Sequence, residues 1–386
     1  MKNVKLGDCL EKVESIAPQK QYGSDSFDYI DISAVNAETK AVEEVKLCTG
    51  ETAPSRARQL LNQSDILVST VRPNLNAVAE VKEEHHLAIG STGFCVLRPK
   101  STLLNSKYLF YWVQSKVFVD DMVKKATGAS YPAVSDTIIK SSEIPLPPLH
   151  IQQHIADTLD KADALRRKDQ ELLKKYDDLA QSIFYDMFGD PVKNEKGWDK
   201  TKIGDITEFM TSGSRGWAKY YSDKGEIFLR INNVKNGKLL LDDIAFVIPP
   251  NTAEAKRTIV QPGDLLVSIT ADLGRTAVIP KNLKSAYINQ HLALIRLKPK
   301  ANPYYLSAFL SSSAGQLQFV QADKGGVKAG LNFADIRRIE VLLPPIEIQN
   351  EFANILSKLG LLEINQIKEL KESDTLFNSL LHRNFS

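Results

Sequence analysis

Residues Pro147 to Phe188 read PPLHIQQHIADTLDKADALRRKDQELLKKYDDLAQSIFYDMF. The two prolines end the preceding segment, because the residue before a proline is pushed out of the α region. Gly189 and Pro191 end the helical pattern that follows. Its apolar residues recur at three- and four-residue steps, interrupted only by Asp169: Ala162, Leu165, Leu172, Tyr176, Leu179 and Ile183. This narrow apolar seam predicts a long helix that pairs with another long helix.

A second pattern of the same kind lies at the C-terminus. Residues 343–349 (LPPIEIQ) repeat residues 146–152 (LPPLHIQ) at an offset of 197. An apolar stripe then continues the helical spacing: Phe352, Ile355, Leu359 and Leu362. Two unrelated surface helices are the simpler interpretation, but the shared Pro-Pro start favours a paired-helix (coiled-coil) spacer. The residues named in the two patterns, from Leu165 to Ile183 and from Phe352 to Leu362, are therefore predicted to pair the helices and to dock partners.

The rest of the chain is also doubled. VKLGD at residues 4–8 corresponds to TKIGD at residues 201–205, again at an offset of 197. SDILVS at residues 64–69 corresponds to GDLLVS at residues 263–268. The collinear matches predict one unit used twice, a mixed globular domain followed by a long helix.

The fold class predicted is α/β (α+β), with a pseudo-twofold internal repeat. Short apolar runs punctuated by Gly, Pro and Asn predict strands, and helical segments follow them at 107–123 and 303–320. The expected organisation is a first domain at 1–146, a central helix at 147–190, a second domain at 191–346 and a C-terminal helix at 347–386.

Composition and charge set bounds on function. The chain has 386 residues, 43% of them apolar and 25% charged, as in an ordinary soluble globular protein. Residues 191–346 carry a formal net charge of +8, whereas residues 1–146 carry −1. A domain this basic favours a polyanionic partner. The sequence has no evident signal peptide or membrane span, and its three cysteines have no C-x-x-C spacing, so a reducing cytoplasm is expected.

The motifs of common enzymes are missing from the sequence. Gly325, Gly326 and Gly330 fit neither the dinucleotide nor the P-loop spacing. Asn302-Pro303-Tyr304 lacks the second proline that an amino-methyltransferase turn would need. The E-x-K triplets at 44–46 and 80–82 would be expected by chance in so charged a chain, and His85-His86 have no partner at metal spacing. We therefore predict no catalytic residue and no metal site.

Features suited to nucleic acid do occur. Residues 124–131 (KKATGASY) join two lysines to small hydroxyl residues, a glycine and a tyrosine, and residues 323–330 (DKGGVKAG) are their counterpart. Such loops let backbone N–H groups approach phosphate while lysine supplies charge. Asparagine and glutamine can pair with adenine edges, although each amide here could equally form a turn. The candidate DNA-binding residues are Arg72, Asn74, Asn76, Lys124, Lys125, Thr127, Ser130, Tyr131, Ser214, Arg215, Asn232, Asn233, Arg275, Asn289, Gln290, His291, Lys324 and Lys328.

Several of these stretches resemble the specificity subunits of type I restriction-modification enzymes. The resemblance is carried by STVRPNLN at 69–76, STGFCVLRP at 91–99, the Pro-Pro starts of both helices, and KAGLNFADIR at 328–337. It covers nearly the whole chain. The net acidic first domain is its one departure from the family's pattern.

The resemblance implies two target recognition domains, held apart by two antiparallel helices, that each read one half of a split double-stranded DNA site. It implies that the helices dock two methyltransferase subunits, and that restriction (translocase) subunits join through the complex. S-adenosylmethionine, ATP and Mg²⁺ would then be bound by those partners and not by this chain. An enzyme acting alone and a bivalent protein-binding scaffold are the alternatives that the sequence leaves open.

Overall fold

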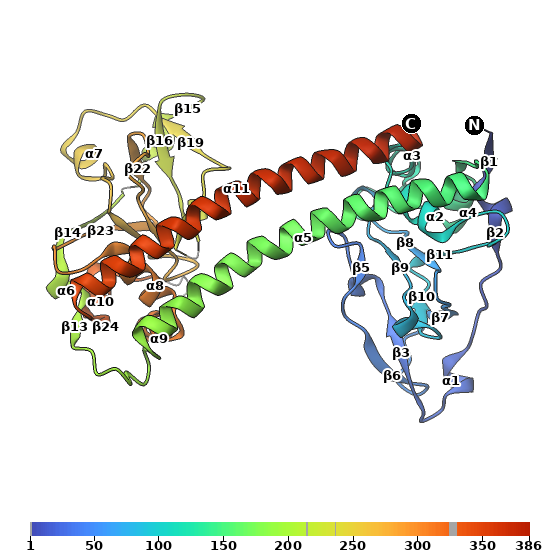
Figure 1. Ribbon diagram of the computed structural model, residues 1–386, viewed down its shortest axis with the longest axis horizontal. Coiled ribbons are helices and arrows are strands. Elements are labelled where there is room, and N and C mark those ends of the chain that lie inside the picture. Colours follow the sequence, from blue (N-terminus) through green and yellow to red (C-terminus); the bar gives the residue numbers. More distant parts are fainter. Residues whose placement is uncertain (1, 214, 236, 324–329) are drawn as a thin grey trace. The chain divides into compact units, whose positions relative to one another are not determined.

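The computed structural model describes residues 2–213, 215–235, 237–323 and 330–386 (Figure 1). The chain divides into two compact units. Unit 1 comprises residues 1–170 and 368–386, and unit 2 comprises residues 171–367. The boundaries fall inside the two long helices, so each unit holds one globular domain, the first part of one long helix and the last part of the other.

The two long helices are α5 (Leu149–Phe188) and α11 (Ile346–Phe385), drawn in green and red in Figure 1. The other α-helices of unit 1 are α1 (Pro18–Gln21), α2 (Ser106–Trp112), α3 (Lys116–Lys125) and α4 (Asp136–Lys140). Those of unit 2 are α6 (Ile203–Ile206), α7 (Ala253–Arg257), α8 (Pro303–Ser311), α9 (Ser313–Ala322) and α10 (Phe333–Arg338). Each of the two helical segments predicted at 107–123 and 303–320 thus consists of two consecutive helices.

The strands of unit 1 form two four-stranded sheets and two short pairs. One sheet has the order β6 (Lys46–Thr49), β3 (Ser26–Ile30), β10 (Ile89–Ser91), β7 (Ala57–Leu60). The other has the order β2 (Leu10–Glu11), β11 (Phe94–Pro99), β8 (Ile66–Ser69), β9 (Val78–Glu80). The short pairs are β1 (Asn3–Lys5) with β12 (Glu143–Pro145) and β4 (Val35–Asn36) with β5 (Ala41–Val42).

Unit 2 repeats most of this topology, although the edge strands of one sheet differ. One sheet has the order β14 (Thr207–Ser212), β23 (Leu292–Leu297), β20 (Leu265–Ser268), β21 (Thr276–Val278). The other has the order β15 (Tyr221–Ser222), β19 (Ala245–Val247), β16 (Glu226–Leu229), β22 (Ala286–Ile288). The short pairs are β13 (Lys200–Lys202) with β24 (Glu340–Leu342) and β17 (Val234–Lys235) with β18 (Lys238–Leu239). A parallel pair, β3 with β10 and β16 with β22, recurs in an otherwise antiparallel arrangement. The prediction of a mixed α/β chain built from one repeated unit is confirmed.

A buried glutamine fastens the start of each long helix to its own domain. The side-chain amide of Gln152 accepts from the backbone N–H of Asn105 at 2.9 Å and donates to the carbonyl oxygen of Pro147 at 2.8 Å. Gln349 makes the same two contacts, with Asn302 at 2.8 Å and Pro344 at 2.7 Å. Both glutamines are fully buried. Because a buried amide needs these partners, the Pro-Pro-x-x-x-Gln motif fixes the direction in which each helix leaves its domain.

The long helices run antiparallel within each unit. In unit 1 the Arg166 guanidinium of α5 lies 4.5 Å from the ring centroid of Phe377 on α11. In unit 2 the rings of Phe184 and Phe188 on α5 lie 5.8 and 5.4 Å from that of Phe352 on α11. Each helix also contributes to both domain cores. Helix α5 places Ile155 and Leu159 in one cluster and Phe184 and Phe188 in the other, and α11 places Phe377 in the first and Phe352 in the second.

Three residues of the predicted seam are exposed and are not packed between the helices. Leu165, Leu179 and Leu362 are 47%, 45% and 50% exposed, whereas Asp169, the residue that interrupts the seam, is only 5% exposed. Leu172, Tyr176, Ile183, Ile355 and Leu359 are partly buried, and Phe352 is fully buried. The reason is that the ends of each helix pack against a domain as well as against the other helix. The domain cores, and not the heptad pattern alone, therefore select the buried face.

Candidate nucleic-acid interface

In unit 1 the loop after β8 lies against the loop before α4. Val71 and Ala133 form an isolated β-bridge. The backbone N–H of Arg72 donates to the carbonyl oxygen of Pro132 at 2.7 Å, and that of Val134 donates to Thr70 at 2.9 Å. These bonds bring together the RPNLN stretch and the KKATGASY stretch, which the sequence presents about 50 residues apart.

The joined loops carry exposed basic and aromatic side chains. The Arg72 guanidinium lies 4.8 Å from the ring centroid of Tyr131, which is 68% exposed. Lys124 and Lys125 end helix α3 and are exposed, and Lys125 also pairs with Asp121 at 2.7 Å. An exposed pair of this kind contributes little stability, so the lysine remains free to exchange its partner. Three more candidates on these loops are exposed: Asn74, Thr127 and Ser130.

Asn76, by contrast, has a structural role. Its φ of +48° places it in the left-handed region, which asparagine tolerates better than most residues. Its carbonyl and side-chain oxygens accept from the Lys40 ammonium at 2.6 and 3.0 Å, and its amide donates to Val113 at 2.8 Å. Asn76 therefore shapes the loop, instead of contacting DNA as predicted.

Unit 2 has the same loop pairing. Thr270 and Gly330 form a β-bridge, and the backbone N–H of Leu331 donates to Ile269 at 2.9 Å. The loop after β20 is thus joined to the end of the segment that precedes α10. Three predicted contacts, Ser214, Lys324 and Lys328, lie outside the described residues.

Side chains at the turn between β22 and β23 are linked to one another by hydrogen bonds. The Nδ1 atom of His291 lies 2.6 Å from the Thr270 hydroxyl, and its Nε2 atom lies 2.9 Å from the Gln290 amide nitrogen. Gln290 and His291 are half-buried. Asn289 is 7% exposed and accepts the His291 backbone N–H at 3.1 Å, so it forms the turn and does not face outward. Thr270 was not among the predicted residues, because a single threonine after a strand gives no sequence signal.

Arg215 and Arg275 lie on loops beside this turn. Gly213 packs so closely that an added Cβ would meet the Ile288 carbonyl oxygen at 2.2 Å, which holds the Arg215 loop against the end of β22. Arg215 is exposed. Arg275 pairs with Asp272 inside the turn after β20. Arg215 is therefore the better placed of the two for an external ligand.

Asn232 and Asn233 build a turn. Asn233 is 1% exposed, and its amide donates to the carbonyl oxygens of Leu240 and Asp243, both at 2.9 Å. Asn232 donates to the Asp243 carboxylate at 2.7 Å. Asn233 has no free edge for a base, so turn chemistry, which the sequence left open, is the correct interpretation of this buried amide.

The β4–β5 and β17–β18 hairpins each place a lysine near the long helices. In unit 2 the Lys238 ammonium lies 2.5 Å from both Asp177 on α5 and Glu363 on α11. In unit 1 burial, together with the positive charge of Arg166 on α5, lowers the pKa of Lys40 to about 8. Sequence reasoning missed both lysines, because neither stands in a recognisable motif.

Among the described residues, no group of three or more His, Cys, Asp or Glu side chains is placed to hold a metal ion. No described helix is both long and apolar enough to cross a membrane.

Comparison with known proteins places these features in a family. Residues 1–175 and 195–372 match the type I restriction modification DNA specificity domain. The chain is 24% identical over 384 residues to the putative type I restriction enzyme MjaX specificity subunit of Methanocaldococcus jannaschii, covering 94% of this chain and 83% of that protein. It is also 24% identical over 321 residues to the type I restriction enzyme EcoKI specificity subunit of Escherichia coli strain K12, covering 78% and 68%.

Solved structures share the fold. One, from work on complex assembly and conformational transition of the type I R-M system, has a TM-score of 0.61 at 24% identity and covers 98% of this chain and 96% of that chain. The type I restriction-modification S subunit from M. genitalium has a TM-score of 0.57 at 14% identity, with 100% and 96% covered. Because the family match covers both repeats and the first part of each long helix, this chain belongs to the type I restriction-modification DNA specificity family.

Proposed function

We propose that this chain is the DNA-recognition subunit of a type I restriction-modification complex, and that each globular domain reads one half of a bipartite, asymmetric DNA site. The observation that carries the proposal is the loop pairing that recurs in both units. In each unit the loop after the buried strand β8 or β20 is bridged to the segment before α4 or α10. The frameworks match while the side chains on the loops differ, which suits two different half-sites on one scaffold.

The side chains on these loops divide between two tasks. The exposed lysines of unit 1 suit phosphate, which any duplex offers, and so they contribute affinity. Gln290 and His291 carry donors and acceptors that suit base edges in the major groove. Residues 191–346 carry a net charge of +8, so the second domain should contribute more than the first to the electrostatic attraction of DNA.

The long helices are proposed to fix the gap between the half-sites and to dock two methyltransferase subunits. Large apolar side chains are exposed along them: Leu165, Leu179, Leu361, Leu362, Ile364 and Ile367. Exposed apolar groups on a helix favour a protein partner over DNA. In this proposal the restriction subunits join through the methyltransferase subunits, and those partners carry out the chemistry with S-adenosylmethionine, ATP and Mg²⁺.

Two measurements test the proposal. Methylome sequencing of cells that carry the complete system should return one split, asymmetric motif. Gel-shift titration of the complex formed with methyltransferase subunits should show tighter binding to that motif than to random duplexes. Equal binding to all duplexes would favour the alternative, a bivalent protein-binding scaffold without DNA specificity.

We expect the double variant Lys124→Ala with Lys125→Ala to weaken binding of the assembled complex to specific and random duplexes alike. Each lost phosphate contact should flatten the slope of log affinity against log salt by about 0.9. Two lost contacts should therefore reduce the slope by about 1.8, while the methylated sequence stays the same.

The matched control is Lys116→Ala with Lys140→Ala, which removes two lysines from other helix positions of unit 1. Both of these lysines pair with an aspartate one helical turn away, as Lys125 does. The control should keep the wild-type salt slope. Equal slopes for the two double variants would show that the loop lysines are ordinary surface residues.

A further inference from the structure

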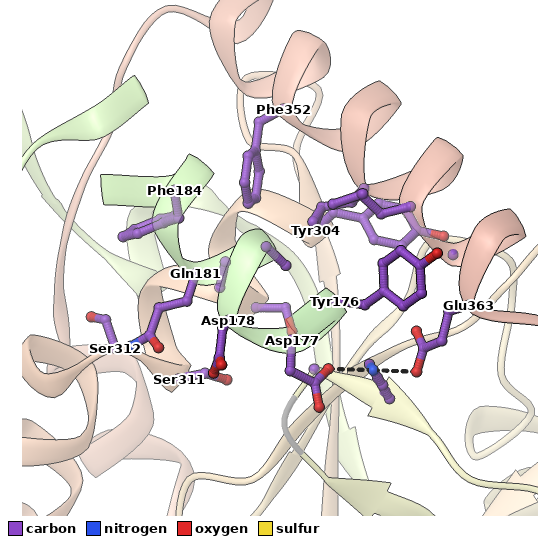
Figure 2. Close-up of a pocket in the computed structure, with 18 of the residues that line it drawn as sticks. Tyr176, Asp177, Asp178, Gln181, Phe184, Tyr304, Ser311, Ser312, Phe352 and Glu363 are labelled. Carbon is purple, nitrogen blue, oxygen red and sulfur yellow. Dashed lines mark hydrogen bonds and ion pairs between the residues drawn. The ribbon is translucent and has the colours of Figure 1, made fainter. Parts of the chain in front are cut away.

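Unit 2 contains a pocket of about 410 Å³. Its walls come from α5, α8, α11 and the turn that carries Gly237 and Lys238. Figure 2 shows Phe184 and Phe352 among the lining side chains, and the dashed ion pairs that join Lys238 to Asp177 and Glu363. The volume is within the range of pockets that bind small molecules or protruding side chains.

The internal repeat explains why the pocket exists. Residues related by the 197-residue offset occupy corresponding places in the two units. The rings of Phe188 and Tyr305 lie 4.6 Å apart in unit 2, and those of Phe385 and Tyr108 lie 5.1 Å apart in unit 1. Positions on α5 and α11 can therefore be compared residue by residue.

Two aromatic rings of unit 1 are replaced by alanines in unit 2. Phe377 and Tyr111 are buried in unit 1, with ring centroids 6.0 Å apart. The offset relates Phe377 to Ala180 and Tyr111 to Ala308, and both alanines line the pocket. The pocket of unit 2 is thus the space that these two rings fill in unit 1.

Unit 1 also indicates the chemistry that suits this space. There the Arg166 guanidinium covers the Phe377 ring at 4.5 Å, and Asp163 accepts from Arg166 at 2.5 Å. In unit 2 the residue that corresponds to Arg166 is Glu363, so the cation over the ring is missing as well. An aromatic ring accompanied by a cation is the combination that unit 2 lacks at this place.

The rim of the pocket is negatively charged. Asp177, Asp178 and Glu363 line it, and among the described residues that line the pocket Lys238 is the one basic side chain. Because Lys238 already contacts Asp177 and Glu363, the carboxylate of Asp178 is the one left for an incoming cation. Charge complementarity therefore favours a basic group beside the ring.

We infer that this pocket receives an aromatic side chain with an adjacent arginine or lysine, presented by the methyltransferase subunit. The inference rests on the proposed function and adds that the two methyltransferase copies bind unequally, since the corresponding place in unit 1 is filled by Phe377 and Tyr111. A second copy of this chain could supply its own Phe377 only by opening unit 1, because that ring is 3% exposed.

The test uses the full chain and the methyltransferase subunit of the same system as the probe. The variant Ala180→Phe with Ala308→Tyr fills the pocket as unit 1 does. Isothermal titration of wild type should resolve a tight and a weak site. In the filled variant the tight site should weaken by about 30-fold or more, as expected when a buried aromatic anchor loses its pocket.

The matched control, Ala180→Ser with Ala308→Ser, leaves the pocket open and should keep both affinities. A second variant, Asp178→Lys, reverses the charge of an exposed rim residue without changing packing, and should weaken the tight site alone. Two equal sites in wild type, or unchanged affinities in both the filled and the charge-reversed variants, would overturn the inference. Failure of wild type to bind any methyltransferase subunit would contradict the proposed function itself.

Discussion

Exchanging residues 191–346 for the second domain of another specificity subunit should change only one half of the methylated sequence. The physical reason is that each domain has its own core and its own pair of bridged loops. The gap should stay the same, because the replacement leaves α5 intact and rejoins α11 at its first turn. Methylome sequencing of cells that carry the chimaera measures both halves and the gap together.

The structure defines what the incoming domain must supply. It needs an aromatic residue at the position of Tyr305, whose ring centroid lies 6.0 and 4.6 Å from those of Phe184 and Phe188. It also needs a residue at the position of Asn302 whose backbone N–H reaches Gln349. The converse exchange of residues 1–146 is the matched control and should change the other half only. A soluble, assembled chimaera in which both halves change would refute separable specificity.

Replacing Asp65 or Asp264 with alanine should destabilise the corresponding unit by about 3–5 kcal/mol, because each substitution leaves a partly buried arginine without its counter-ion. Both aspartates are 1% exposed. The Asp65 carboxylate accepts from Arg98 at 2.8 and 2.7 Å and from the backbone N–H of Asn62 at 2.8 Å. Asp264 accepts two bonds from Arg296, both at 2.8 Å, and a third from Gln261 at 2.7 Å.

The larger loss is expected for Asp65→Ala. The Arg98 side chain is 14% exposed and that of Arg296 is 28% exposed, so water can compensate the Arg296 charge better. Urea unfolding followed by tryptophan fluorescence separates the units, since Trp112 belongs to unit 1 while Trp198 and Trp217 belong to unit 2.

The matched control replaces both members of the pair, as Asp65→Leu with Arg98→Met. Apolar replacement of a whole buried ion pair is often close to neutral, so this double variant should regain much of the lost stability. If the double variant were as unstable as Asp65→Ala, the loss would come from disturbed packing and not from an uncompensated charge. The consequence for function is direct, because these carboxylates stand one residue before β8 and β20, whose ends carry the candidate loops.

The local chemistry of the sequence was sufficient to predict the architecture. The Pro-Pro starts and Gly189 set the ends of the long helices, because prolines and a C-terminal glycine act on the backbone within one turn. The 197-residue repeat predicted that one fold is used twice. The match between Gln152 and Gln349 in the sequence became the same hydrogen bonds in both units.

Only the tertiary structure decided which side chains are available. Asn76, Asn233 and Asn289 have the residue type of a base reader, but their amide groups are used by neighbouring backbone and by Lys40. Leu165 and Leu179 have the spacing of a helix seam, yet they are exposed. A pattern records residue type and spacing, whereas burial depends on every element that packs around a residue. The same holds for Ala180 and Ala308, which appear ordinary in sequence and line a pocket where, among the described residues of unit 2, no ring replaces those of Phe377 and Tyr111.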